Sequence, residues 1–370
     1  MMTKDHTDPA QPKLTKVLRE DLRRGDFKRT IRRDWNELKE FYLDQERQTR
    51  LLAMGKVKRF FVMTWWLLKS LFLKLTPVRR ILLLLSCWLI LQSGTINYAG
   101  EQVQFNNDTS KIGFIVLLFI LMLELKDKLL AQSELAAGRS VQRALMPKQN
   151  PNISGWDIWL MTRPANEVGG DLVDFLEIGK NRFGVALGDV AGKGLKAALL
   201  MVKLQATLRA LAADFTSLAE LGAKLNTILR RDGLPDTFAS LVYSELLADS
   251  GTVRLLNAGH MPPILLKDNR AQEMPHGTAA LGVLPAANFT EQRIDLQRGD
   301  TLLIYSDGLT EARNEAGDFF GEERLFALLA SLTGLAAHEI GARILREVEN
   351  FIGEAKAYDD LSLIVLQRLL

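Results

Sequence analysis

The sequence of 370 residues contains one cysteine, Cys87, and only four histidines. One cysteine excludes a disulfide framework and a zinc site built from several thiolates. So few imidazoles also argue against a metal cluster made of histidines. The first residues lack the basic, apolar and small-residue succession of a cleaved secretory signal, so none is expected. The 44 aspartates and glutamates are therefore the side chains from which we expect a chemical site to be built.

Long apolar runs are also missing, because none reaches the roughly 20 residues that span a bilayer as a helix. The two longest cover residues 81–91 and 112–123. Both are dense in Leu, Ile and Phe without amphipathic periodicity, which favours a membrane hairpin with spans over 81–99 and 112–125. Re-entrant helices, or helices buried in a protein core, are the alternative.

Basic residues flank these two runs. Arg79 and Arg80 precede the first, and Lys126 and Lys128 follow the second. The positive-inside rule places both outer ends of such a hairpin in the cytoplasm, with a short external loop between the runs.

Positive charge is concentrated at one end of the chain. Residues 1–80 carry 20 Lys and Arg against 10 Asp and Glu, whereas the whole chain carries 47 against 44. We expect residues 1–56 to form a basic helical cytoplasmic segment. Residues 57–75 suit a helix in the membrane interface, with Trp65 and Trp66 near the headgroups. Because aromatics and apolar runs adjoin these cations, an anionic membrane explains them better than a nucleic acid, and no nucleic-acid binding is expected.

A helical, amphipathic pattern continues over residues 126–149, where Leu129, Leu130 and Val141 could form an apolar stripe and Pro147 ends the helix. A plain linker helix is one interpretation. The position of this segment between the apolar runs and the next domain also suits dimerisation or a switch element, and the pattern does not decide between them.

Residues 150–370 have the pattern of a compact α+β domain. Strands are expected over 157–163, 173–178, 182–189, 238–246, 252–258, 262–267, 290–296, 301–307 and 360–369. Helices are expected over 194–213, 217–231, 321–333 and 336–353. Because the strands follow one another at hairpin spacing and the helices come in pairs, antiparallel sheets with helices outside are favoured over an alternating parallel fold.

Acidic residues recur where these strands begin or end. Asp171 follows two glycines, Asp189 and Asp307 come at the ends of apolar strands beside glycine, and Asp359 and Asp360 open the last strand. Any one of them could be a turn former or a helix cap. Together they suggest a metal site, because clustered carboxylates repel one another unless a hard cation neutralises them.

The ligand chemistry narrows the choice of metal. Oxygen ligands with few imidazoles suit Mg²⁺ or Mn²⁺. Two such ions can activate a water for in-line attack on phosphorus while they neutralise the phosphoryl oxygens. These residues therefore indicate metal-assisted phosphate hydrolysis, although their spacing alone does not bring the aspartates together.

Five segments of the chain resemble the SpoIIE-type branch of the metal-dependent PPM (PP2C-like) serine/threonine phosphatases. In order, they are GGDLVDF, GDVAGKGLKAALLM, LNAGHMPPILL, LIYSDGLTEARN and YDDLSLIVL. The lead-in SVQRALMPKQNP is also similar to the helix that precedes that catalytic domain, so the resemblance covers about residues 135–370. It implies a four-layer α-β-β-α sandwich, here preceded by a helical, membrane-associated N-terminal region, with two Mn²⁺ or Mg²⁺ ions at one edge of the sandwich.

The resemblance also implies roles for single residues. Asp189 would bridge the two ions, with the carbonyl of Val190 beside it, and Asp307 and Asp359 would be further ligands. Asp171 would lie close to the metals, directly or through water. The catalytic residues would be Asp189 and Asp307, with a metal-bound water as the nucleophile in place of a side chain.

Other matching positions would surround these ligands: Asp174, Gly192, Gly194, His260, Gly308 and Asp360. His260 is expected to be a buried structural histidine, with a proton donor as the alternative. Arg163 could bind substrate phosphate, or it could be a solvated strand end. The chain departs from the pattern at Val173, where the branch often has an aromatic residue, and at Lys193, where histidine is common.

The function implied is a membrane-tethered, metal-dependent phosphatase that acts on phosphoserine or phosphothreonine, with an anti-sigma-factor antagonist of the STAS type as the expected substrate. The alternative is a non-catalytic scaffold that binds the phosphoprotein at the membrane. We expect the catalytic domain to lie in the cytoplasm at the bacterial inner membrane, and a homodimer is possible.

Overall fold

The computed structural model describes residues 50–51, 54–91, 95–98, 101–104, 108–147, 149–233, 237–268 and 270–369. The chain forms two compact units, Met1–Lys128 and Leu129–Leu370, which are described separately. Of the basic segment expected over residues 1–56, residues 1–49 lie outside the described residues.

Within its described residues, the first unit contains helices α4 (Lys56–Lys74) and α5 (Pro77–Leu91), a small hairpin of β1 (Thr95–Tyr98) and β2 (Glu101–Gln104), and the first part of α6 (Asp108–Leu145). Helices α5 and α6 pack closely at Gly113, where a Cβ would lie 2.8 Å from both Ile90 Cγ1 and the carbonyl oxygen of Ser86. The Arg79 guanidinium joins the same two helices, since it donates to Glu124 and Asp127 at 2.6 Å each.

The predicted transmembrane hairpin is not confirmed in the described residues. Residues 81–99 are not one helix, because α5 ends at Leu91 and a strand follows from Thr95. A helix of 15 residues rises only about 22 Å. Residues 112–125 do lie in a helix, α6, but their apolar run is short because charged residues stand at both of its ends. Within the described ranges, no helix is both long and apolar enough to cross a bilayer.

The second unit contains two antiparallel five-stranded sheets, with orders β10-β7-β6-β5-β4 and β3-β12-β11-β8-β9. The strands of the first sheet are β4 (Leu172–Gly179), β5 (Arg182–Val190), β6 (Ala239–Leu247), β7 (Thr252–Ala258) and β10 (Glu291–Asp295). Those of the second are β3 (Trp156–Arg163), β8 (Ile264–Lys267), β9 (Arg270–Glu273), β11 (Thr301–Tyr305) and β12 (Leu361–Arg368). Short hairpin connections join β4 to β5, β6 to β7 and β8 to β9, and longer connections join the other neighbours.

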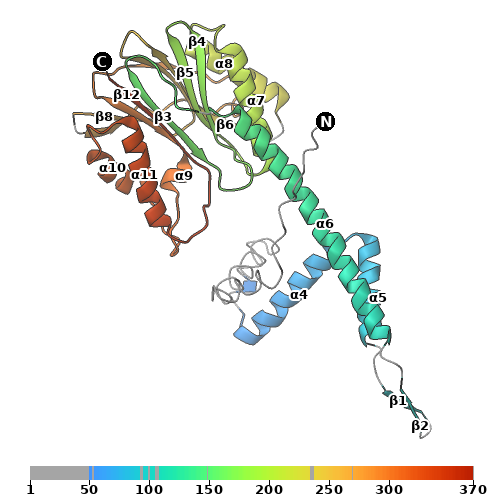
Figure 1. The fold of residues 1–370 in the computed structure, drawn as a ribbon. Coiled ribbons are helices and arrows are strands. Elements are labelled where there is room, and N and C mark those ends of the chain that lie inside the picture. The colour runs from blue at the N-terminus through green and yellow to red at the C-terminus, as the bar shows by residue number, and fades with distance from the viewer. Residues whose placement is uncertain are drawn as a thin grey trace, which may run out of the picture. The chain divides into compact units, whose positions relative to one another are not determined.

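Helices cover the outer face of each sheet (Figure 1). Helices α7 (Leu195–Leu211) and α8 (Leu218–Asp232) lie on the first sheet, and α10 (Glu322–Ala330) and α11 (Ala337–Ile352) lie on the second. Helix α11 turns Ile340, Ile344 and Val348 inward at a spacing of four residues. It packs so closely that a Cβ at Gly341 would lie 2.2 Å from the ring of Trp159 on β3.

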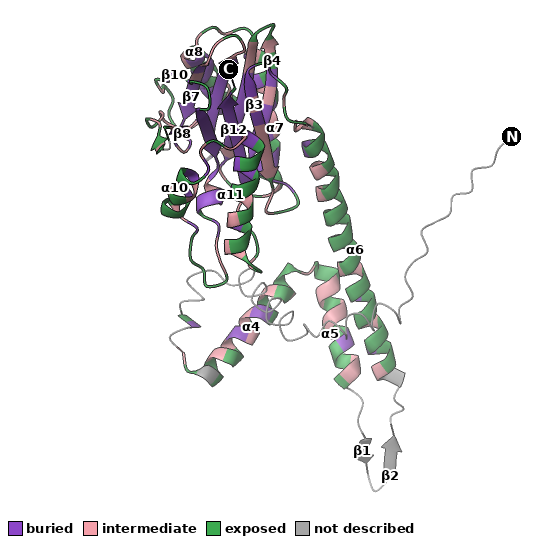
Figure 2. Cartoon of the chain, turned by 60° about the vertical axis from the view of Figure 1, so that its left-hand side comes forward, coloured by how far each residue is buried: buried purple, intermediate pink, exposed green. Residues whose placement is uncertain are grey.

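Three apolar layers hold this unit together. One fills the space between the first sheet and its helices, one lies between the second sheet and its helices, and the third lies between the sheets. Figure 2 shows the strands almost entirely buried and the outward faces of the helices exposed. The predicted sandwich of two antiparallel sheets with outer helices is therefore confirmed.

Sequence patterns locate most of these elements within two residues, with three differences. Strand β9 and the short helix α9 (Asp307–Thr310) were not expected. The linker predicted over 126–149 is the second half of α6, which runs without a break from Asp108 to Leu145. Asp307 does not end strand β11, which stops at Tyr305, but begins α9.

Candidate metal centre

The candidate centre is built around Asp189, near the end of strand β5. The loop before β4 crosses it closely, because a Cβ on Gly170 would lie 3.3 Å from Asp189 Oδ1 and 3.3 Å from the carbonyl oxygen of Val190. The carboxylate of Asp189 and the carbonyl of Val190 therefore face the same stretch of backbone. Both are oxygen donors of the kind that hard divalent cations prefer.

Asp171 lies at the start of β4, next to that crossing point, and is almost completely buried. Its Oδ2 atom is buried and has no hydrogen-bond partner. Burial holds the pKa of Asp171 well above its usual range, and the charges of Asp189 and Asp360 raise it further, while the nearby hydroxyls of Ser362 and Ser306 lower it. An acidic oxygen without a partner in this position is a donor that a cation could satisfy.

Asp307 and Asp359 bring further negative charge to Asp189. Burial raises the pKa of Asp189 to about 6, and the charges of Asp307, Asp359 and Asp360 contribute to the rise. Burial and the charges of Asp359 and Glu311 also raise the pKa of Asp307. Carboxylates from β5, α9 and the start of β12 thus lie close enough to repel one another, as the sequence pattern predicts.

Asp360 has a different task from its neighbour. Its carboxylate accepts hydrogen bonds from the backbone N–H groups of Ala165 at 2.7 Å and Gly170 at 2.6 Å. It therefore fixes the loop that carries Asp171. Glycine at 308 is required by the same packing, since a Cβ there would lie 1.9 Å from the carbonyl oxygen of Asp360.

Lys193 supplies a positive charge at the edge of the cluster. Its Nζ atom lies 2.9 Å from Asp359 Oδ2 and donates to the carbonyl oxygen of Tyr358, also at 2.9 Å. Among the described residues, no three His, Cys, Asp or Glu side chains are arranged to hold an ion as they stand. In this arrangement Asp359 is paired with Lys193, and Asp360 accepts from the backbone.

The residues nevertheless fit a hard divalent cation. Several carboxylates with raised pKa values, the unpartnered oxygen of Asp171 and the carbonyl of Val190 together form an oxygen-only donor set. The backbone around them is adapted to close approach, because Gly192 at φ +110° and Gly194 at φ +75° adopt conformations that favour glycine. Gly194 is also the N-cap of α7, so its conformation starts that helix.

Two expected site residues have other partners. Asp174 is fully buried and accepts two hydrogen bonds from Arg209 of α7, at 2.6 and 2.7 Å. Arg163, at the end of β3, forms an ion pair with Glu349 of α11. Asp174 thus joins a strand to its covering helix, and the Arg163 guanidinium is engaged by a carboxylate. Their roles near the metals or at substrate phosphate stay predictions without geometric support.

His260, just after β7, is buried. Its Nε2–H donates to the carbonyl oxygen of Tyr305 at 3.1 Å, and Nδ1 accepts from Ser240 Oγ at 2.7 Å. Burial lowers the pKa of His260 to about 4. Both nitrogens of this neutral histidine are hydrogen-bonded, so that His260 links β6 to β11.

Sequence reasoning missed one buried contact beside the site. Gln142 of α6 donates to the carbonyl oxygen of Gly169 at 2.7 Å and accepts from its N–H at 3.1 Å. Gln142 therefore holds the same loop as Asp360 does, the loop that leads to Asp171. A lone glutamine on an amphipathic helix gives no warning of such a contact.

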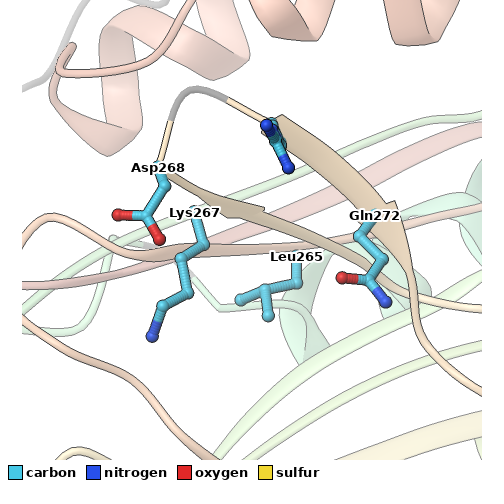
Figure 3. Close-up of a pocket in the computed structure, with 5 residues that line it drawn as sticks. Leu265, Lys267, Asp268 and Gln272 are labelled. Atoms are coloured by element: carbon cyan, nitrogen blue, oxygen red, sulfur yellow. The ribbon is translucent and has the colours of Figure 1, made fainter.

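A pocket elsewhere in the unit contains none of the aspartates of the candidate centre, and its one acidic lining residue is Asp268. It is lined by residues of the β8–β9 hairpin, including Leu265, Lys267 and Gln272 (Figure 3). Lys267 pairs with Asp300 at 3.3 Å. Its lining offers neither clustered carboxylates nor an unpartnered buried polar atom.

Comparison with known proteins gives consistent results. The family model described as Stage II sporulation protein E (SpoIIE) matches residues 179–369. Protein IcfG of Synechocystis sp. is 26% identical over 312 residues, which cover 75% of this chain and 49% of IcfG. The phosphoserine phosphatase RsbU of Bacillus subtilis is 27% identical over 242 residues, 64% of this chain and 70% of RsbU. The chain therefore spans about half the length of IcfG and more of RsbU.

A solved structure shows the same fold. The PP2C domain of SiaA from Pseudomonas aeruginosa superposes with a TM-score of 0.58 at 19% identity, over 66% of this chain and 99% of that domain. The family match begins after Asp171. The placement of Asp171 beside the cluster therefore rests on the geometry described above.

Proposed function

The chain belongs to the Stage II sporulation protein E (SpoIIE) family, and we propose that it hydrolyses phosphoserine or phosphothreonine in a protein substrate with the help of Mn²⁺ or Mg²⁺. The observation that carries this proposal is the convergence of Asp189, Asp307 and Asp359, whose charges add to burial in raising the pKa of Asp189 to about 6. Such mutual repulsion is relieved by a bound cation, and clusters of perturbed carboxylates mark functional sites.

The chain's own residues prepare the site. Asp189, Asp307, Asp359 and the carbonyl of Val190 would hold the ions, with Asp171 beside them. When bound, the ions would supply a water of lowered pKa and neutralise phosphoryl oxygens. Asp360 and Gln142 orient the loop that carries Asp171, through its backbone at Gly169 and Gly170.

The expected substrate is a phosphorylated STAS-type antagonist of an anti-sigma factor. The support is the resemblance to the SpoIIE-type branch and the similarity to RsbU, which is named a phosphoserine phosphatase. Asp189, Asp307 and Asp359 are partly exposed, which suits a phosphorylated side chain on a folded protein better than a small ligand that needs an enclosed pocket.

The experiment that tests the activity is hydrolysis of p-nitrophenyl phosphate by the full chain with and without Mn²⁺. We expect turnover that requires the metal and that falls at least about a hundredfold in Asp189→Asn, because a carboxylate that would hold the ions is lost. Equal turnover in the wild type and the variant would refute the assignment of the site.

A scaffold that binds a phosphoprotein without turnover is the second candidate. The observation in its favour is the pairing of Asp359 with Lys193, which occupies a metal ligand. Calorimetric titration with Mn²⁺ separates the two candidates, since a scaffold need not bind the metal at all.

We also propose that the protein attaches to the cytoplasmic face of the bacterial inner membrane through α4. This helix exposes Phe60, Phe61 and Trp65, and it carries several lysines and arginines. Exposed aromatics beside cations suit an anionic lipid surface.

The attachment is tested by sedimentation of the full chain with lipid vesicles. We expect the chain to sediment with vesicles containing phosphatidylglycerol but not with neutral vesicles, and Trp65→Ser should weaken this binding. Sedimentation that does not depend on Trp65 would contradict the attachment through α4.

We also propose that the second half of α6 regulates the activity. Exposed Leu129, Leu130 and Val141 could pair two copies of this helix in a homodimer. The same helix contacts the loop before Asp171 through Gln142, so a shift of the helix would change the position of Gly169. Light scattering of the wild type and of Leu129→Glu tests the dimer.

A further inference from the structure

Arg313 follows α9 and lies between two aromatic rings. Its guanidinium carbon is 4.7 Å from the ring centre of Phe319 and 4.1 Å from that of Tyr358. A bridge between the backbones of Arg313 and Phe319 fixes the base of this arrangement. Stacking on two aromatic faces holds a guanidinium in a defined plane while its N–H groups remain free to bond at the edge.

The guanidinium has no polar partner. In the part of the chain that the structure describes, Arg313 forms no hydrogen bond or ion pair, and its Nε atom is buried without an acceptor. Arg163 differs, because it is paired with Glu349, and so does Arg324, which donates to two backbone carbonyls. An N–H group buried without a partner is costly, which suggests that a ligand supplies the acceptor.

Arg313 lies beside the candidate metal centre. Tyr358, on which it stacks, directly precedes Asp359, and the Lys193 Nζ atom lies 4.1 Å from the centre of the same ring. Two cations therefore share one aromatic side chain at the border of the carboxylate cluster. Since a phosphate monoester is a dianion and the cluster is acidic, a substrate phosphoryl group needs positive charge at this border in addition to metal ions.

We propose that Arg313, held flat by Phe319 and Tyr358, binds the phosphoryl group of the substrate. The planar fork of arginine matches phosphate oxygens better than the ammonium of a lysine does. This inference deepens the proposed phosphatase function and rests on it, and it assigns substrate binding to Arg313 in place of the engaged Arg163.

The test compares Arg313→Ala with Arg313→Lys, and with Arg343→Ala as a control that removes an arginine from the surface of α11. The full chain with Mn²⁺ is assayed on p-nitrophenyl phosphate and inhibited with inorganic phosphate. In Arg313→Ala we expect KM and the inhibition constant of phosphate to rise by about ten- to one-hundredfold, the range for hydrogen bonds to charged groups, with a smaller change in kcat. Arg313→Lys should lie between, and Arg343→Ala should match the wild type.

Three results would overturn the inference: KM and phosphate inhibition unchanged in Arg313→Ala, a fall in kcat alone, or a defect seen with a phosphoprotein but not with the small ester. If Arg313→Ala does not fold, Arg313→Lys and Phe319→Leu must still raise KM, or the inference fails. If the wild type shows no hydrolysis, the proposed activity fails by itself. Calorimetric titration of inorganic phosphate into the full chain with Mg²⁺ then decides the role of Arg313, since binding must weaken in Arg313→Ala.

Discussion

The Nζ atom of Lys193 lies 2.9 Å from Oδ2 of Asp359, so that a cation of the chain itself neutralises one of the carboxylates expected to bind a metal. The pair is half exposed, and such pairs are weak because water and salt screen them. A divalent ion can therefore displace the ammonium, but it must compete with it.

Replacing Lys193 by Met should strengthen metal binding. The variant removes the competing cation, and a partly exposed ion pair contributes up to about 1 kcal/mol, so we expect Mn²⁺ to bind up to about fivefold more tightly in a calorimetric titration. Lys196→Met is the matched control, since Lys196 is an exposed lysine three residues further along the chain, in the first turn of α7. Weaker binding in Lys193→Met than in the control would show that Lys193 does not compete with the metal.

Replacing Asp307 by Asn should have opposite effects on activity and on stability. Turnover should fall at least about a hundredfold, because a metal ligand is lost. The melting temperature of the metal-free protein should rise, because one of several mutually repelling carboxylates is gone. Scanning calorimetry in EDTA measures the second effect, and a lower melting temperature would contradict the clustering of these charges.

Replacing Gln142 by Ala should loosen the loop that carries Asp171. The N–H and carbonyl of Gly169 lose their side-chain partners in a buried position, at a cost of about 1–3 kcal/mol. We expect a lower melting temperature and weaker Mn²⁺ binding, whereas Gln132→Ala on the exposed face of α6 should change neither. If the affinity for Mn²⁺ is unaltered in Gln142→Ala, the contact of Gln142 with Gly169 does not affect the metal site.

Acidification should destabilise the protein through His260. Burial lowers its pKa to about 4 from the ordinary 6.5, so the unfolded chain binds the proton more readily. The stabilisation of the neutral form is complete above pH 6.5 and is lost as the pH falls toward 4. Between pH 7 and 5 this amounts to about 2 kcal/mol.

Urea unfolding at these two pH values measures the effect of His260. The raised pKa values of Asp171, Asp189 and Asp307 act in the opposite direction, so the wild type must be compared with His260→Asn, in which the loss on acidification should be smaller. His338→Asn, at an exposed position of α11, serves as the control. Identical pH dependence in wild type and His260→Asn would contradict the buried neutral imidazole.

Local patterns were sufficient to predict the sandwich, because short apolar runs at hairpin spacing predicted the strands. The meeting of Asp189, Asp307 and Asp359 was implied only by the resemblance to the phosphatase family, since their spacing along the chain does not bring them together. The same reasoning failed where a partner lies far along the chain. Asp174 bonds to Arg209, Arg163 pairs with Glu349, and Lys193 pairs with Asp359.

The N-terminal unit shows a second limit. Composition predicted apolar helices, but it did not predict the end of α5 at Leu91, the unbroken length of α6 or the close packing of the two helices at Gly113. Gly113 lies inside an apolar run and gives no sign of that contact. The stacked arrangement of Arg313 was equally invisible, because Phe319 and Tyr358 come from separate segments.

The most direct test of the account is a crystal structure of the full chain grown with Mn²⁺, with anomalous difference density used to locate the metal. We predict density for two ions enclosed by Asp189, Asp307, Asp359 and the carbonyl of Val190, with the Lys193 ammonium moved away from Asp359. Ions bound elsewhere, or no density between these aspartates at saturating Mn²⁺, would contradict the metal centre on which the proposed function depends.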